Sequence, residues 1–158
     1  MASIDLSGLK PSLNASVIAG LQKAVSQSLA LSVLSKNAHV NVSGPDFFQL
    51  HDAFGAIYDR ASADLDDLAE RMRALDAPVT LCLTEADNTS GLPCLETPFN
   101  AQGAVATILR AQDIIVSDLA AVMNLADSVG DKVTANALQD KIYATQKSNW
   151  FLKSYLRS

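Results

Sequence analysis

Long proline-free stretches, in which apolar residues recur every three or four positions, constrain the fold of this chain more than any other feature. The first covers residues 13–38, and a second covers residues 46–75. This spacing predicts two long amphipathic α-helices. Gly44 and Pro45 interrupt the pattern between them, and Ser43, Pro45 and Asp46 provide an N-cap, a first-turn proline and a dipole-matching acid for the second helix.

Two further helices are expected in the C-terminal half. Asn100 can cap one that runs to about residue 126, and another runs from about residue 131 to the end of the sequence. Residues 79–98 contain Gly91, Pro93 and Pro98 and predict a long connection, with a short helix around residues 83–87. Two tight loops around one long connection predict an all-α fold, a ferritin-like four-helix bundle with one crossover.

Composition supports a single domain over residues 1–158, in which residues 1–12 form a flexible tail. Hydrophobic residues make up 49% of the chain and aromatic residues only 6%, which favours packed helices over strands. The net charge of −5 and the lack of a basic tail argue against a nucleic-acid arm. Cys82 and Cys94 have no zinc-like spacing and are expected to be free thiols. No secretion signal or membrane-length apolar run is recognised, which predicts a cytoplasmic protein with no membrane partner.

The two histidines of the chain, His39 and His51, flank the first turn between helices. In a helical hairpin, these two positions can face each other. On the second helix, an arc of about 100° beside His51 holds four acids: Asp52, Asp59, Asp66 and Glu70. A solvated acidic face is the plainer explanation of such a stripe. Imidazole together with carboxylate is, however, a ligand mixture that suits Fe(II).

Helix length excludes a metal site made by one chain. Fifteen residues separate His51 from Asp66, a distance of about 22 Å along the helix. If two copies of the second helix cross antiparallel near residues 59–63, His51 of one chain lies beside Asp66 and Glu70 of the other. The residues around this crossing are small: Ala56, Ala61, Ser62 and Ala63.

The sequence resembles the Dps proteins, the mini-ferritins of prokaryotes. The resemblance rests on His39-Val-Asn-Val-Ser-Gly-Pro-Asp-Phe-Phe-Gln-Leu-His51, on Asp66-Asp-Leu-Ala-Glu70-Arg71, and on Asn149-Trp150 near the end. It implies a dodecameric shell built from two-fold dimers, which oxidises Fe(II) with hydrogen peroxide or oxygen and stores ferric mineral inside. This ferroxidase activity protects against oxidative stress.

The resemblance also implies the roles of individual residues. His39 and His51 of one subunit would bind iron with Asp66 and Glu70 of its partner. Gly55 stands where the family usually has an aspartate, although Asp52 and Asp59 lie on the same arc and can substitute in part. The expected consequence is weaker iron binding or a preference for zinc or another divalent metal. The alternative function is a structural or metal-sequestering cage with an impaired ferroxidase centre and little turnover.

Two other family features bear on this chain. Acidic pores admit iron near the start of the last helix, where Asp131 matches the pattern, Asn136 departs from it, and Asp127 and Asp140 can supply negative charge. A first-turn acid serving the helix dipole explains Asp131 equally well. Lys-rich tails coat DNA in some family members, but this chain has none, so direct DNA binding is not expected.

Overall fold

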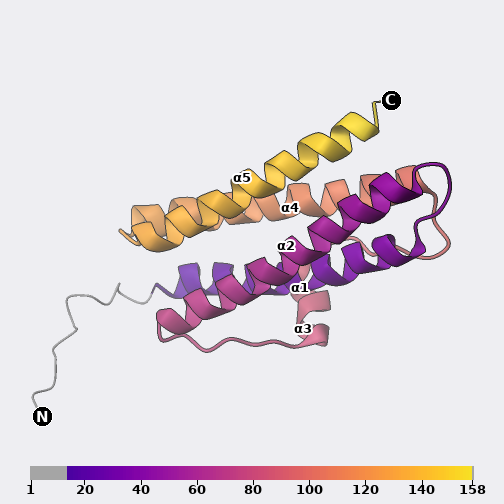
Figure 1. Cartoon of the computed structure of the whole chain (residues 1–158). Helices are drawn as coiled ribbons and strands as arrows, with labels where there is room; N and C mark the ends of the chain where they lie inside the picture. Colours follow the sequence, from indigo (N-terminus) through magenta and orange to yellow (C-terminus); the bar gives the residue numbers. More distant parts are fainter. Residues whose placement is uncertain (1–13, 158) are drawn as a thin grey trace, which may run out of the picture.

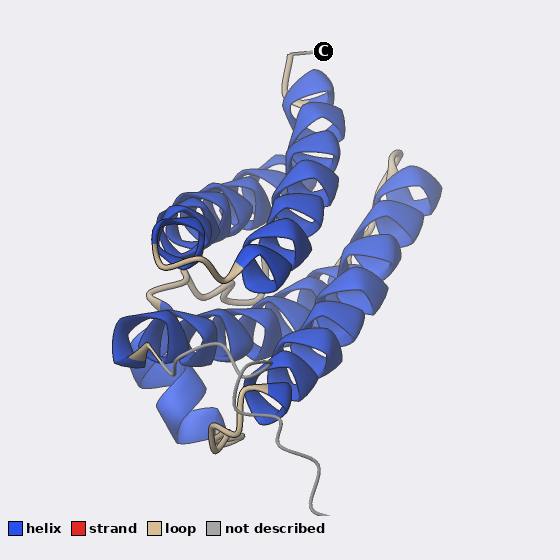
Figure 2. Ribbon diagram, turned by 90° about the vertical axis from the view of Figure 1, so that its left-hand side faces the viewer, coloured by secondary structure: helices blue, strands red, loops and turns tan. Residues whose placement is uncertain are grey.

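The computed structural model describes residues 14–157, which fold into five helices (Figure 1). Their bounds are α1 Ala15–Asn41, α2 Phe47–Ala74, α3 Leu83–Ser90, α4 Ala101–Ser128 and α5 Lys132–Tyr155. Across these residues no strand occurs (Figure 2). The predicted all-α fold is therefore confirmed, including the short helix within the long connection.

The bundle consists of two helical hairpins packed against each other. α1 packs on α2, and α4 packs on α5, while contacts between α1 and α4 join the two pairs. α3 covers the side of α1 away from α5 (Figures 1 and 2). The backbones of α2 and α5 come close at only a few points, and side chains such as Lys141 bridge the space between them.

The core is built from the residues that the helical periodicity predicts to face inward. Phe54, Met72 and Ile108 are among the largest fully buried side chains. Two glutamines, Gln27 and Gln112, are also completely buried, so the core contains polar groups that the apolar pattern did not indicate. Gln112 accepts a hydrogen bond from Arg60, whose pKa is lowered by burial and raised in part by Asp64.

The cap predicted for α2 is wrong. The helix begins at Phe47, with Asp46 rather than Ser43 at the N-cap position and no side-chain cap hydrogen bond. A turn with Gly44 at φ +101° precedes it, and the carboxylate of Asp46 instead accepts a hydrogen bond from the Tyr155 hydroxyl at 3.0 Å. This carboxylate therefore links the start of α2 to the end of α5.

Three other helices do have a side-chain cap. Asn100 accepts from the N–H of Gly103, as predicted, and Asn14 and Asp131 cap α1 and α5. The expectation of a flexible tail over residues 1–12 lies outside the described residues.

α1 is long and apolar enough to meet the length and composition of a membrane span. Its apolar window is, however, 56% buried inside the bundle, as in the core helix of a folded domain. Its hydropathy therefore has an explanation in packing.

Candidate metal centre

His39 and His51 meet at one end of the α1–α2 hairpin. His39 lies in the last turn of α1, and His51 lies near the start of α2. Their rings stack with centroids 3.7 Å apart and planes inclined by 27°. Nδ1 of His39 is 2.8 Å from the backbone oxygen of His51, and Nδ1 of His51 is 2.9 Å from that of His39. The structure thus brings together the two histidines that the sequence placed on either side of the turn.

These reciprocal contacts determine which nitrogen carries the proton. A carbonyl oxygen only accepts hydrogen bonds, so Nδ1 of each neutral ring must be the donor. Nε2 of each ring then carries the lone pair that a metal ion needs, and no group within residues 14–157 hydrogen-bonds to it. Hydrogen bonding of the other ring nitrogen to a backbone carbonyl is the usual way in which proteins orient histidine ligands. Both rings are therefore prepared to bind metal.

The surroundings of the pair restrict its movement further. The Phe47 ring lies against His51 with centroids 5.1 Å apart. On the other side, a Cβ atom built on Gly55 would lie 3.1 Å from Nδ1 and 3.2 Å from Cε1 of His39. A side chain at position 55 would therefore crowd His39 unless the ring moved by a few tenths of an ångström.

The acids predicted to complete the site lie along α2, from Asp52 beside His51 to Glu70 near the end of the helix. Asp52, Asp59, Asp66 and Glu70 are all exposed. Within residues 14–157, no group of three or more His, Cys, Asp or Glu side chains is close enough to hold a metal ion. A single chain thus presents two imidazoles near the start of α2 and keeps Asp66 and Glu70 more than four turns further along this helix.

The acids on α2 fall into two classes. Asp64 and Asp67 both accept from the Nζ of Lys141 at 2.8 Å. In contrast, Asp52, Asp59, Asp66 and Glu70 form no ion pair with a lysine or arginine of the described residues. The unpaired acids are the ones on the arc beside His51. Sequence spacing did not reveal the pairing of Lys141 with α2, because it depends on how α5 packs.

The three acids assigned to an ion pore have different environments. Asp131 is 8% exposed, pairs with Arg71 at 2.9 Å, and accepts from both the N–H and the hydroxyl of Thr134. Asp127 pairs with Lys132, whereas Asp140 is exposed and forms no ion pair within the described chain. The capping role of Asp131 is thus observed, and of the three acids only Asp140 forms no ion pair within residues 14–157.

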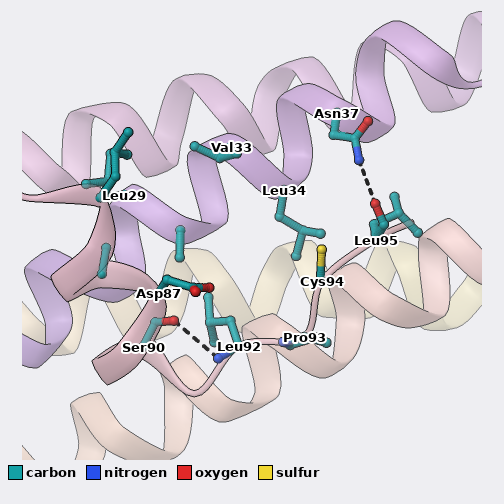
Figure 3. A pocket seen from close by; sticks show the side chains of 13 residues that line it. Leu29, Val33, Leu34, Asn37, Asp87, Ser90, Leu92, Pro93, Cys94 and Leu95 are labelled. Atoms are coloured by element: carbon teal, nitrogen blue, oxygen red, sulfur yellow. Dashed lines mark hydrogen bonds between the residues drawn. The ribbon is translucent and has the colours of Figure 1, made fainter. Parts of the chain in front are cut away.

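A separate cavity of about 200 Å³ lies between α1 and α3 (Figure 3). Its walls are mainly apolar and include Leu29, Leu34 and Leu92, with Asn37 donating to the backbone oxygen of Leu95 at its edge. It contains no histidine and one cysteine, Cys94, which is an exposed free thiol, as is Cys82. This cavity lacks the donors of the histidine pair and is not the candidate metal centre.

The bundle with one crossover and the paired histidines at the end of a hairpin define a ferritin-like protein. A model of the ferritin-like domain matches residues 18–158. General stress protein 20U of Bacillus subtilis is 32% identical over 140 residues, covering 89% of this chain and 97% of the relative. The DNA protection during starvation protein of Helicobacter pylori is 31% identical over 137 residues, covering 86% of this chain and 95% of the relative.

Solved structures agree with this relationship. The structure of Dps from Staphylococcus aureus has a TM-score of 0.86 at 29% identity, covering 89% of this chain and 94% of that one. Antigen TpF1 from Treponema pallidum has a TM-score of 0.87 at 25% identity, covering 94% and 99%. The chain therefore belongs to the ferritin-like family and, within it, to the Dps proteins.

Proposed function

We propose that this protein is an iron-oxidising and iron-storing mini-ferritin that acts in the cytoplasm against oxidative stress. Fe(II) is its substrate, and hydrogen peroxide or oxygen is the oxidant. The observation that carries the proposal is the histidine pair, because its reciprocal hydrogen bonds leave both Nε2 lone pairs free. Imidazole and carboxylate are suitable donors for Fe(II), and the unpaired acids of α2 supply the second type.

Two subunits are needed to complete each site. Antiparallel crossing of two α2 helices near Asp59 brings His39 and His51 beside Asp66 and Glu70 of the partner subunit, twice by symmetry. Asp52 and Asp59 lie on the same exposed face and can add donors through water. Large apolar side chains on the surface also favour self-association: Val33, Val40, Phe48, Leu83, Trp150 and Phe151. We infer a homo-oligomer, with the dodecamer of two-fold dimers as the expected form.

The stacked rings favour two iron ions rather than one. An imidazole lone pair lies in the plane of its ring, and planes inclined by only 27° do not direct two lone pairs to one ion at a bond length of about 2 Å. Each histidine would therefore serve its own ion, with carboxylates of the partner subunit between the two, as in other two-metal sites. Two Fe(II) ions give two electrons, so one hydrogen peroxide and two protons become two water molecules. No hydroxyl radical is released in this balance.

Complementation between variants tests the shared site. One chain carries His39→Ala and His51→Ala, and a second carries Asp66→Ala and Glu70→Ala. Each homo-oligomer should oxidise Fe(II) with peroxide no faster than buffer. Refolding the two chains together should restore activity, because in each mixed dimer one site has its histidines from the second chain and its acids from the first. Mixed oligomers that stay inactive, beside an active wild type, would rule out the shared site.

Gly55 supports the second candidate function, a metal-sequestering cage with little turnover. In that case the wild-type protein would bind Fe(II) at the subunit interface, yet ferric product would form at the rate of buffer. Zinc or another divalent ion would occupy the same donors. Measuring Fe(II) binding without oxygen, and then oxidation after peroxide is added, separates the two functions.

In this proposal iron reaches the interior through acidic pores, for which Asp127, Asp131 and Asp140 are the candidate acids. Direct DNA binding is not part of it. A shell made of copies with a charge of −5 repels DNA through long-range electrostatics. Gel-shift assays at low salt should therefore show free DNA, and a tight complex would contradict this expectation.

A further inference from the structure

Gly55 lies in the third turn of α2, next to the ring of His39. Glycine in a helix is less favourable than alanine, because its backbone loses more conformational freedom on folding. The position has an ordinary helical backbone, since its φ is not among the positive ones. Backbone conformation therefore gives no reason for glycine here, whereas the space above it does.

That space is filled by the imidazole of His39. A Cβ atom at position 55 would lie 3.1 Å from Nδ1 and 3.2 Å from Cε1, which is closer than ordinary van der Waals contact. The ring is also stacked on His51, with the two ring centroids 3.7 Å apart. A shift of the ring away from the backbone of α2 would relieve the crowding and would lengthen the hydrogen bond from Nδ1 to the His51 oxygen.

We propose that Gly55 is a positioning residue for the metal centre. The missing side chain allows His39 to settle against α2, donate from Nδ1 to the His51 carbonyl, and keep Nε2 as the free nitrogen. The inference rests on the proposed function. This proposal differs from the view that position 55 has simply lost a ligand. It assigns the absence of a side chain at Gly55 a role in positioning His39, a ligand that is present.

The two views make different predictions for Gly55→Ala. In Gly55→Ala, a methyl group crowds His39 and adds no donor, so loss of positioning should weaken Fe(II) binding by about tenfold or more, as is typical when support for a ligand is removed. If position 55 had only lost a ligand, Gly55→Ala would bind Fe(II) like the wild type and Gly55→Asp would bind more tightly. Gly103→Ala is the matched control, since its Cβ would contact only Asn100 at the start of α4.

The experiment measures anaerobic Fe(II) affinity by calorimetry for all four assembled proteins, together with crystal structures of metal-free wild type and Gly55→Ala. Thermal unfolding shows whether the alanine variant remains folded, and helix propensity predicts no loss of stability. The proposal expects weaker binding by Gly55→Ala alone of the two alanine variants, and a His39 ring displaced from the His51 oxygen.

Either of two results would overturn the proposal: unchanged or tighter binding by Gly55→Ala, or a His39 ring that keeps its hydrogen bond in the alanine variant. If the wild type fails to bind Fe(II), the proposed function fails. The metal-free crystal structures still decide whether Gly55 positions His39.

Discussion

Removing the buried carboxylate of Asp131 should destabilise the bundle strongly, because this group has three partners. It caps α5 through the N–H of Thr134 at 3.0 Å, accepts from the Thr134 hydroxyl, and pairs with Arg71 at 2.9 Å. Loss of an N-cap costs about 1 kcal/mol. Loss of the ion pair with Arg71 adds about 2 kcal/mol, below the usual range for a buried pair because the arginine keeps its hydrogen bond to the Thr134 hydroxyl and, at 19% exposed, can turn toward water.

Asp131→Ala should therefore lower the free energy of unfolding by about 3 kcal/mol. Asp131→Asn keeps a capping oxygen and should lose only about 1 to 2 kcal/mol. Asp127→Ala is the control: its pair with Lys132 is exposed, and such pairs contribute about 1 kcal/mol or less. Urea unfolding at a fixed chain concentration measures all three, since association adds to the apparent stability. An Asp131→Ala protein as stable as the Asp127→Ala protein would refute this account of the α5 terminus.

Three further predictions concern other parts of the chain. Burial lowers the pKa of Lys141, but its bonds to Asp64 and Asp67 outweigh this effect and raise the pKa above the ordinary 10.5. Its stabilising contribution is present below pH 10.5 and is lost as the pH rises through the raised pKa, so Lys141→Met should remove this alkaline loss from unfolding curves measured against pH. Backbone N–H groups of Glu85 and then Thr84 lower the pKa of Cys82. Iodoacetamide at neutral pH should therefore label Cys82 before Cys94, as measured by peptide mass spectrometry. Equal labelling of the two cysteines would contradict this prediction. Gly20→Ala should lower the thermal midpoint, because the new Cβ overlaps a methyl group of Val122, and adding Val122→Ala should restore it.

The architecture could be predicted from the sequence because periodicity and breakers report local structure directly. The apolar spacing of residues 46–75 predicted the buried stripe of α2, and Asn100 correctly predicted the start of α4. The cap of α2 was predicted wrongly because Ser43 fits a local motif, while the Asp46 carboxylate is bound by Tyr155 from the far end of the chain. A contact across 109 positions leaves no local pattern.

The candidate site shows the same difference between features that local sequence predicts and contacts that depend on packing. The turn between α1 and α2 placed His39 opposite His51, and the structure confirms that the two rings meet. Spacing could not predict that each Nδ1 bonds to the other residue's backbone, because that depends on the rotation of both rings. Nor could it show that His39 fills the volume above Gly55. From the sequence alone, Gly55 shows only that the aspartate usual in the family is missing at this position.

The division of donors along α2 links iron to the association of subunits. The histidine half of the site forms between residues only twelve positions apart, so it is complete within one hairpin. Under the proposed function, the carboxylate half arrives only with a second chain. Linkage then requires that iron strengthen subunit association by the same factor by which association strengthens iron binding. At low protein concentration, subunits would associate as the Fe(II) concentration rises. The iron that the shell stores would then also promote assembly of the shell.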